Sequence, residues 1–258
     1  MNYEKAEQAF RNFVKNYDIN HDKISRKINH TFEVVKLSEH IAKQLNLSNE
    51  HIELAKIVAL LHDIGRFEQA RVYGNFDDYL TFDHGEYGAK ILLENNLIRK
   101  FVEDDKNDKL ILNVVRSHNK HIISEYLTEE ELLYSNIVRD ADKLDNYRVA
   151  LITDVKSLGT NTEEAILITQ TITDEVFNDI MNCKSSARSK MKNGLDKWVS
   201  YAAHVFDFHF NICLKDIKEK NYINLILDRF TFKNKETQNR IEVIRECVNN
   251  YIEETLIK

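Results

Sequence analysis

The sequence predicts an all-α protein. Apolar residues recur at helical spacing through most of the 258 residues, and no segment has the alternating pattern of a strand. Proline is absent and only six glycines occur, as expected for helices joined by few sharp corners. Four of the glycines (Gly65, Gly74, Gly85 and Gly88) lie close together in the sequence, which indicates tight backbone approach in that region.

Three helices are expected before the glycine-rich region. Residues 3–17 predict a short amphipathic helix, and a second helix opens at Asp22 or Ser25. A third, strongly apolar helix is predicted over residues 50–62. The segment 65–80 combines glycine with aromatic residues, so we expect an irregular loop that covers a pocket.

Capping boxes mark two of the later helices. Asp83 with Glu86 opens one of them, and Thr128 with Glu131 opens a long helix that runs to about residue 157. Helical periodicity also predicts elements over 110–121 and 161–258, including a longer helix around 190–220. Apart from the loop over residues 65–80, the prediction is therefore helical along the chain.

Composition excludes several classes of protein. The formal net charge of −6 does not indicate a general nucleic-acid-binding protein. The three cysteines lack CxxC spacing, which argues against a disulfide framework and against a thiolate metal site. The N-terminus has no signal-peptide pattern, and no apolar run approaches the roughly 18 residues of a membrane span. We therefore expect a cytoplasmic protein, and a homodimer remains an option.

The most informative feature is the adjacent pair His62 and Asp63. An apolar helix that ends near Leu61 leads directly into this pair, so both side chains are expected in the core. An imidazole and a carboxylate are costly to bury unless another group compensates them. Because a metal ion would compensate both, metal binding is the hypothesis that the rest of the sequence has to test.

Further imidazoles and carboxylates fall on apolar helix faces. The complete set of candidate metal ligands is His30, His62, Asp63, His84, His118 and Asp142. Nitrogen and carboxylate ligands without sulfur suit Fe, Mn, Zn or Mg. Six protein ligands exceed what one catalytic ion needs and suit two ions that share a bridging carboxylate. The alternatives are an ordinary first-turn role for His84 and a hydrogen-bonded core position for His118.

The order of these residues resembles the HD superfamily of metal-dependent phosphohydrolases. The resemblance rests on the strings NHT at 29–31, LHDIG at 61–65, HGEYGA at 84–89, SHN at 117–119 and RDADKLD at 139–145. It covers roughly residues 27–148. It implies an HD-domain helical bundle, which we expect over residues 1–158. We also expect the helices of residues 159–258 to pack on this bundle as one compact unit and to complete the substrate pocket.

The resemblance also implies roles for single residues. One metal site would be made by His30, His62, Asp63 and Asp142, and the other by His84 and His118, with Asp63 as the bridge. Arg66 stands where related hydrolases often have lysine, and a permanent cation is suited to hold a substrate phosphate. The mononuclear nucleotidases have glutamate at this position, and a chain without proline lacks the Gly-Tyr-Pro motif of certain cyclic-dinucleotide phosphodiesterases, so both branches are disfavoured.

Other residues carry weaker signals. Lys143 is a candidate, with Arg66, to stabilise charge on the reacting phosphate. Asp145 suits either the support of a metal ligand or a solvated helix face. The basic run that contains Lys190 favours a solvated face, with a phosphate-binding lid as the alternative, and His204 is a candidate substrate contact.

Three functions compete at this stage. The first is hydrolysis of a phosphate ester in a small phosphorylated compound, such as a nucleotide, through attack by metal-activated water. The ligand types also resemble those of the di-iron oxygenases of this superfamily, such as the inositol oxygenase group, in which the metals activate oxygen. The third is a non-catalytic protein that keeps the ions and binds a nucleotide. The ligand set alone does not separate the first two functions.

Overall fold

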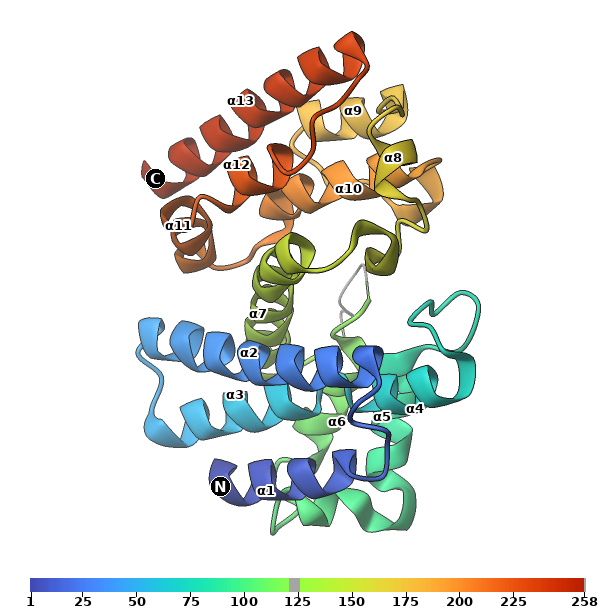
Figure 1. Cartoon of the computed structure of the whole chain (residues 1–258). Coiled ribbons are helices and arrows are strands. Elements are labelled where there is room, and N and C mark those ends of the chain that lie inside the picture. Colours follow the sequence, from blue (N-terminus) through green and yellow to red (C-terminus); the bar gives the residue numbers. More distant parts are fainter. Residues whose placement is uncertain (121–125, 258) are drawn as a thin grey trace. The chain divides into compact units, whose positions relative to one another are not determined.

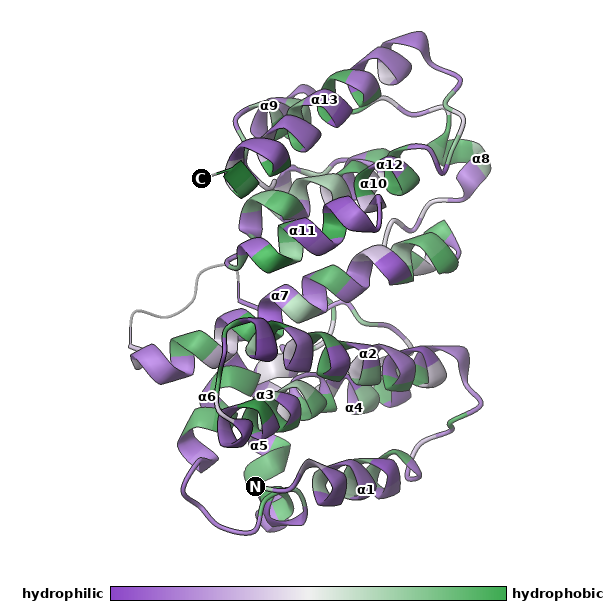
Figure 2. Ribbon diagram, turned by 90° about the vertical axis from the view of Figure 1, so that its left-hand side faces the viewer, coloured by the Kyte–Doolittle hydropathy of each residue, from purple (hydrophilic) through white to green (hydrophobic). Residues whose placement is uncertain are grey.

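The structure, a computed structural model, describes residues 1–120 and 126–257 of the chain (Figure 1). Every regular element among these residues is a helix, so the all-α prediction is confirmed. Hydrophobic and hydrophilic residues alternate along most of the helices, in agreement with the periodicity of the sequence (Figure 2).

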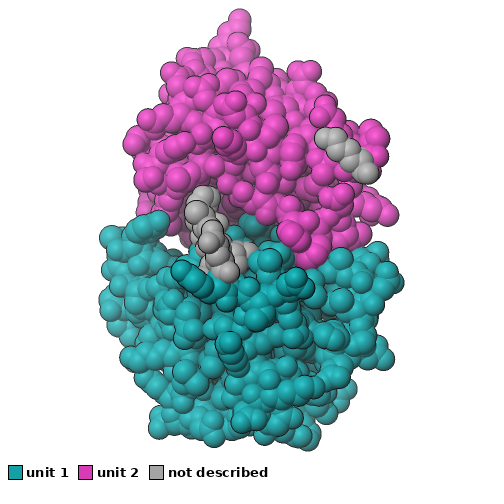
Figure 3. Space-filling model, turned by 180° about the vertical axis from the view of Figure 1, so that it is seen from behind, with its two compact units in different colours: residues 1–145 teal, residues 146–258 magenta. Residues whose placement is uncertain are grey.

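The chain divides into two compact units. Unit 1 comprises residues 1–145 and unit 2 comprises residues 146–258 (Figure 3). The division falls within the long helix α7 (Glu129–Ile152), whereas the sequence analysis placed a boundary after residue 158. The last turns of α7 therefore belong to unit 2.

Unit 1 holds the predicted metal ligands. Its elements are α1 (Tyr3–Val14), α2 (Asp22–Gln44), α3 (Asn49–Leu61), α4 (Ile64–Tyr73), α5 (His84–Leu93), the 3-10 helix η1 (Glu94–Lys100), α6 (Asp108–Ser117) and the first part of α7. Helix α3 contacts α1, α2 and α6, and its last five residues, 57–61, are all apolar and fully buried. The helix predicted over 110–121 thus ends at Ser117, and residue 121 lies outside the described part of the chain.

Of the two predicted capping boxes, that of Thr128 and Glu131 has both hydrogen bonds, whereas at Asp83 only the N-cap half is present and the Glu86 carboxylate pairs with Arg116. The Asp83 carboxylate accepts from the backbone amides of Gly85 and Glu86, at 3.0 and 3.1 Å, and so fixes the start of α5. At the start of α7, the Thr128 amide donates to the Glu131 carboxylate at 2.8 Å, and the Glu131 amide donates to the Thr128 hydroxyl at 3.2 Å. These two starts matter for the site, because α5 and α7 each carry a candidate ligand.

The loop predicted over residues 65–80 is wrong in its first half, which forms α4. Gly65 is a packing residue of this helix, because a Cβ there would lie 2.4 Å from the carbonyl oxygen of His84 on α5. Phe67 faces the core and is fully buried. Glycine and aromatic residues were interpreted as signs of a loop, but Gly65 serves the close contact of α4 with α5, and the Phe67 ring packs against the rings of Phe10, Phe13 and Tyr17.

Unit 2 is also helical. Its elements are η2 (Val155–Leu158), α8 (Glu164–Leu167), α9 (Asp174–Met181), η3 (Arg188–Lys190), α10 (Gly194–Ala203), η4 (His204–Asp207), α11 (Asn211–Glu219), α12 (Tyr222–Leu227) and α13 (Lys235–Ile257). The longer helix predicted around 190–220 is wrong, because this segment forms α10 and α11 with η4 between them. Phe208 and Phe210 take extended backbone conformations there, which interrupts the helix.

Candidate metal centre

The pair His62 and Asp63 lies where α3 ends and α4 begins. His62 follows the last residue of α3, and Asp63 has φ −103° and ψ 18°, outside the helical region. The break between the two helices therefore gives the two neighbouring side chains different directions. Both are buried, at 0% and 3% exposure, so their polar atoms need partners inside the protein.

The structure brings four predicted histidines together around Asp63. His30 comes from the middle of α2, and His62 follows the end of α3. His84 is the first residue of α5, and His118 follows the end of α6. All four are buried. Helix ends position three of these side chains, and so the packing of the helices determines where the imidazoles meet.

Two of the histidines are oriented by backbone carbonyls. Nδ1 of His62 donates to the carbonyl oxygen of Ala59 at 2.6 Å, and Nδ1 of His118 donates to that of Val115 at 2.8 Å. A carbonyl oxygen only accepts, so the proton must be on Nδ1 in both rings. Nε2 of each neutral ring then carries the free lone pair, as a metal ligand requires.

The other two histidines are oriented by carboxylates. Nδ1 of His30 donates to Asp145 Oδ2, and Nδ1 of His84 donates to Asp78 Oδ2, both at 2.7 Å. Of the two roles left open for Asp145, support of a ligand therefore matches its position, and its exposure of 2% excludes a solvated face. A carboxylate behind an imidazole is a common support for a metal-binding histidine because it makes the ring a stronger ligand.

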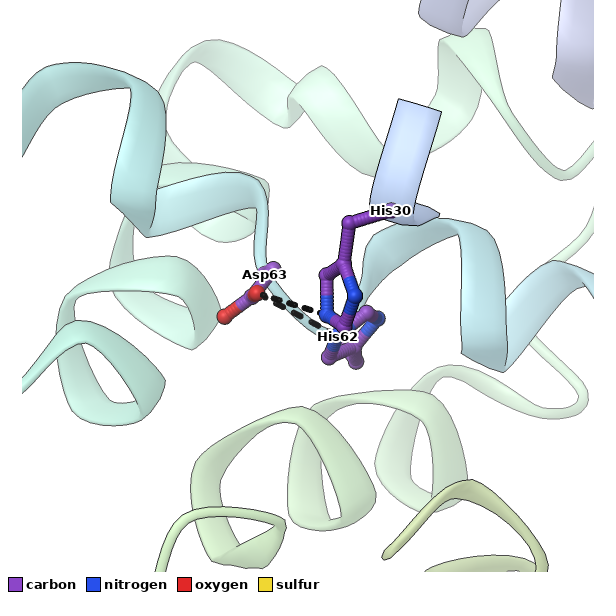
Figure 4. Close-up of side chains that lie close together, drawn as sticks. All are labelled: His30, His62 and Asp63. Carbon is purple, nitrogen blue, oxygen red and sulfur yellow. Dashed lines mark ion pairs between the residues drawn. The ribbon is translucent and has the colours of Figure 1, made fainter. Parts of the chain in front are cut away.

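The two oxygens of Asp63 face different pairs of histidines. Oδ2 lies 3.3 Å from Nε2 of His62 and 3.7 Å from Nε2 of His30 (Figure 4). Oδ1 lies 3.2 Å from Nε2 of His84 and 3.6 Å from Nε2 of His118. Each set of three residues offers ligand atoms that lie within 4.8 Å of one another. Asp63 is shared by both sets, so its carboxylate has the position of a bridge.

The arrangement of the ring nitrogens fits a bound cation. Nε2 of His84 and Nε2 of His118 lie 3.0 Å apart, although both Nδ1 atoms already donate elsewhere. Two lone pairs at this distance repel each other unless a proton or a metal ion lies close to both. Nε2 of His62 is buried and makes no hydrogen bond to any described residue. Divalent metal ions would satisfy these nitrogens and Asp63 together.

Asp142, the sixth predicted ligand, lies beside His30. It comes from α7, and its Oδ1 is 3.1 Å from Nε2 of His30. Its side chain is 27% exposed, whereas those of His30 and Asp63 are 4% exposed. Asp142 is therefore the ligand candidate on the side of the cluster where solvent reaches.

At His118 and Asp63, the electrostatic environment favours the protonation states that bind metal. Burial, together with the neighbouring rings of His84 and His62, lowers the pKa of His118 to about 4, so this imidazole is neutral at neutral pH. Burial opposes ionisation of Asp63, but Lys27 and His62 outweigh it and hold the pKa of this carboxyl well below its usual range. A neutral imidazole and an ionised carboxylate are metal ligands without further loss of protons.

Arg66 lies next to the cluster but is already held by other groups. Its Nη1 donates to Gln69 Oε1 at 2.6 Å, to the carbonyl oxygen of Phe76 at 2.7 Å and to Asp78 Oδ1 at 2.6 Å. Its Nε points to the other side, 3.6 Å from Asp63 Oδ1, and makes no hydrogen bond to any described residue. The guanidinium is thus fixed beside the central carboxylate.

The remaining predicted residues occupy two regions. Lys143 follows Asp142 on α7 in unit 1. Lys190 and His204 belong to unit 2, where the Lys190 ammonium pairs with Asp179 at 2.8 Å and the His204 ring contacts that of Tyr201. The roles assigned to these three residues stay predictions.

Two residues of the cluster were missed in the sequence. Asp78 lies in a segment without periodicity, so nothing in its neighbourhood marks it as the partner of His84. Lys27 forms an ion pair with Asp63 Oδ2. It precedes His30 by three residues, and this spacing, which puts both side chains on one face of α2, is a signal that could have identified it.

Comparisons with known proteins place this cluster in a family. The family model described as HD domain matches residues 28–147, and neither the curated proteins nor the solved structures yielded a match. Among the described residues, no helix has both the length and the hydrophobicity that crossing a membrane requires. HD domains generally bind divalent metals, and the His/Asp groups of this chain are suited to hold them. Residues 28–147 are an HD domain of the superfamily of metal-dependent phosphohydrolases.

Proposed function

We propose that this protein is a phosphohydrolase that uses two divalent ions to cleave a phosphate ester in a small compound, a nucleotide or a related molecule. The observation that carries the proposal is the position of Asp63, whose two oxygens face separate pairs of histidines. One ion would be held by His30, His62, Asp63 and Asp142, and the other by His84, His118 and Asp63. The donor set suits Fe, Mn, Zn or Mg.

The bound ions would supply Lewis acidity, which polarises a phosphoryl oxygen and lowers the pKa of water. The protein's own residues would orient the reactants. Asp145 and Asp78 hold His30 and His84 in fixed directions, which limits the reorganisation needed during the reaction. Asp142, the most exposed ligand candidate, would border the position where a phosphate enters.

Arg66 is the proposed binding group for the negative charge of the substrate. Its Nε is directed toward Asp63 and its Nη1 is held by Asp78, so the cation cannot turn away from the cluster. Lys143, Lys190 and His204 are proposed as further contacts of the phosphate or of the rest of the substrate. In the same way, a contribution of residues 159–258 to the substrate pocket stays a proposal.

The two-ion arrangement is tested by counting metals per chain. Asp63→Ala removes the shared ligand, so this variant is expected to bind no metal, whereas His118→Ala is expected to retain one ion and lose most activity. His51→Ala is a matched control, because its ring is 46% exposed and lies outside the cluster. Elemental analysis of purified protein gives the count. Two metals per chain in Asp63→Ala would show that the bridge is wrong.

An oxygenase with the same ligands is the second candidate function, because the donor set also suits two iron ions. Phosphate release from p-nitrophenyl phosphate or from nucleotides, measured without oxygen, separates the two functions. Release under these conditions supports hydrolysis. An iron-loaded protein that releases no phosphate and consumes oxygen with an organic substrate would support the oxygenase.

A further inference from the structure

Lys27 contacts the central carboxylate of the cluster without being one of the candidate ligands. Its ammonium forms an ion pair with Oδ2 of Asp63, the oxygen that faces His30 and His62. The Lys27 side chain is 18% exposed, and that of Asp63 is 4% exposed. A carboxylate that is buried to this degree requires a positive partner, and Lys27 provides it.

The same oxygen is the one that a metal ion between His30, His62 and Asp63 would use. A divalent ion and an ammonium group on one carboxylate oxygen repel each other strongly where water is largely excluded. When an ion binds, the ammonium of Lys27 therefore has to leave Asp63. The ion replaces it as the positive partner of the buried charge.

Lys27 has the freedom to move, in contrast to the other cation at the cluster. Arg66 is held at three acceptors by its Nη1. Lys27 has a flexible four-carbon side chain, its ammonium lies 5.6 Å from the ring centroid of Phe76, and the Arg66 guanidinium lies 5.8 Å from the same ring. An ammonium displaced from Asp63 stays beside Phe76 and Arg66, next to the metals, where it adds positive charge toward an incoming anion.

We propose that Lys27 is an exchangeable counter-ion of this site. In the metal-free protein it neutralises Asp63, and in the metal-loaded protein it turns to an oxyanion of the phosphate group that binds over the ions. The second half rests on the proposed phosphohydrolase function. The first half rests only on metal binding by the cluster.

Lys27→Gln tests both halves, with Lys36→Gln as the matched control. Lys36 lies on the same helix and loses the same charge, but it pairs with Glu33 on the surface and is 68% exposed. We expect Lys27→Gln to bind Mn²⁺ about tenfold more tightly, because no ammonium competes for Asp63, and to bind inorganic phosphate about tenfold more weakly once loaded with Mn²⁺. Titration calorimetry measures both, and Lys36→Gln should match the wild type.

The two expected changes, tighter binding of Mn²⁺ and weaker binding of phosphate, distinguish this role of Lys27 from a structural one. A residue that only supports the fold would weaken both affinities together, and that result would overturn the proposal, as would an unchanged affinity for Mn²⁺. Lys27→Arg, which keeps the charge, should restore a metal affinity close to that of the wild type.

Two further measurements test the two halves of the proposal separately. Removing Lys27 should lower the melting temperature of the metal-free protein and leave that of the loaded protein nearly unchanged; equal losses in both forms would overturn the proposal. A loaded wild type that binds no phosphate would overturn the phosphate half and the phosphohydrolase function, while tighter Mn²⁺ binding by Lys27→Gln would still support the counter-ion half.

Discussion

The direction of each metal-binding lone pair depends on one hydrogen bond on the far side of the imidazole. His62 and His118 use backbone carbonyls for this purpose, and a side-chain substitution cannot remove those acceptors. His30 and His84 use the carboxylates of Asp145 and Asp78, which makes their orientation sensitive to single substitutions. The two proposed sites therefore depend on different carboxylates, because Asp145 orients His30 and Asp78 orients His84. Substituting one of these carboxylates should weaken only the site that it supports.

Asp78→Asn is expected to weaken one site selectively. An amide nitrogen facing Nδ1 of His84 would favour the other tautomer, and the ion pair with Arg66 would be lost as well. We expect a loss of roughly 10- to 100-fold in the affinity of the ion held by His84 and His118, with the other ion retained. Metal titration followed by elemental analysis measures the two affinities.

Asp77→Asn is the control for this substitution. Asp77 is the adjacent carboxylate and accepts from the backbone amide of Tyr79 at 3.0 Å, which asparagine oxygen can also do. The control should bind both ions as the wild type does. If Asp78→Asn binds both ions with unchanged affinity, the carboxylate behind His84 has no effect on the metal.

The candidate ligands were predictable from the sequence because they lie at fixed places relative to helices. His62 and Asp63 interrupt an apolar run, and His84 follows a capping aspartate, so their surroundings mark them. Asp78 lacks such surroundings because it reaches His84 from an irregular segment, and only the folded chain brings the two together. The ion pair of Lys27 with Asp63 also joins residues that are 36 positions apart, although the spacing of Lys27 from His30 is a local signal.

The contact between α4 and α5 depends on glycine. A Cβ at Gly65 would meet the carbonyl oxygen of His84 at 2.4 Å and the amide nitrogen of Gly88 at 3.0 Å, and both are backbone atoms that cannot rotate away. Gly65→Ala therefore has to push the two helices apart. We expect a loss of about 1–3 kcal/mol in stability, together with weaker metal binding because His84 moves. Urea unfolding and metal titration measure these effects.

Gly74→Ala separates stability from metal binding in this experiment. Gly74 ends α4 with φ +63°, and no atom would lie within 4 Å of an added Cβ. Alanine there costs about 1–2 kcal/mol through its backbone conformation alone, and metal affinity should stay at the wild-type value. Equal metal affinities in both variants would contradict the role of the α4–α5 contact in positioning His84.

The capping box of α7 also connects that helix to α6. Glu131 accepts from the Thr128 amide at 2.8 Å and from the Asn113 side chain on α6 at 2.6 Å. Burial opposes ionisation of Glu131, but these hydrogen bonds outweigh it and lower its pKa below the usual value of 4.5. A carboxyl group whose pKa is lowered in the folded state adds stability above the unfolded pKa, and this contribution is lost as pH falls through the folded value.

Glu131→Gln should therefore be less stable than the wild type by about 1 kcal/mol at pH 7, because a neutral acceptor replaces a charged one. The difference should shrink as the pH falls below 4.5, where the wild-type carboxylate becomes protonated. Urea unfolding across this range measures the effect, and Glu130→Gln, with a side chain that is 54% exposed, is the control. A difference that is independent of pH would exclude the ionised capping box.

Caps and periodicity were sufficient to predict most helices, because both are local properties of the chain. The start of α5 at Asp83 and the start of α7 at Thr128 required only residues within one turn. Helix α4 was missed because the signal of Gly65 is ambiguous: the same residue suits a loop or a close helix contact. Only the position of α5, set by contacts distant in sequence, decides between the two.

Helix α7 contains residues of both units. It carries Asp142 in unit 1, and its last turns belong to unit 2. There, Arg229 donates to the carbonyl oxygen of Thr153 at 2.8 Å and to that of Ala150, and so it satisfies the end of the helix. The same guanidinium lies 5.3 Å from the ring centroid of Trp198, which is buried and is the single tryptophan of the chain. Trp198 fluorescence therefore reports on unit 2 and on the end of α7.

Metal removal is expected to lower the melting temperature of both units together. Ions that bind only the folded state stabilise it by about 2.7 kcal/mol per site at a hundredfold excess over the dissociation constant. Because a helix melts cooperatively, stabilising α7 around Asp142 also holds the turns that Arg229 and Trp198 contact. Far-UV circular dichroism and Trp198 fluorescence should thus shift equally when a chelator is added. Arg229→Gln should reduce the shift in melting temperature that fluorescence records, but not the shift that dichroism records. If the fluorescence transition of the wild type does not change when metal is removed, the two units unfold independently.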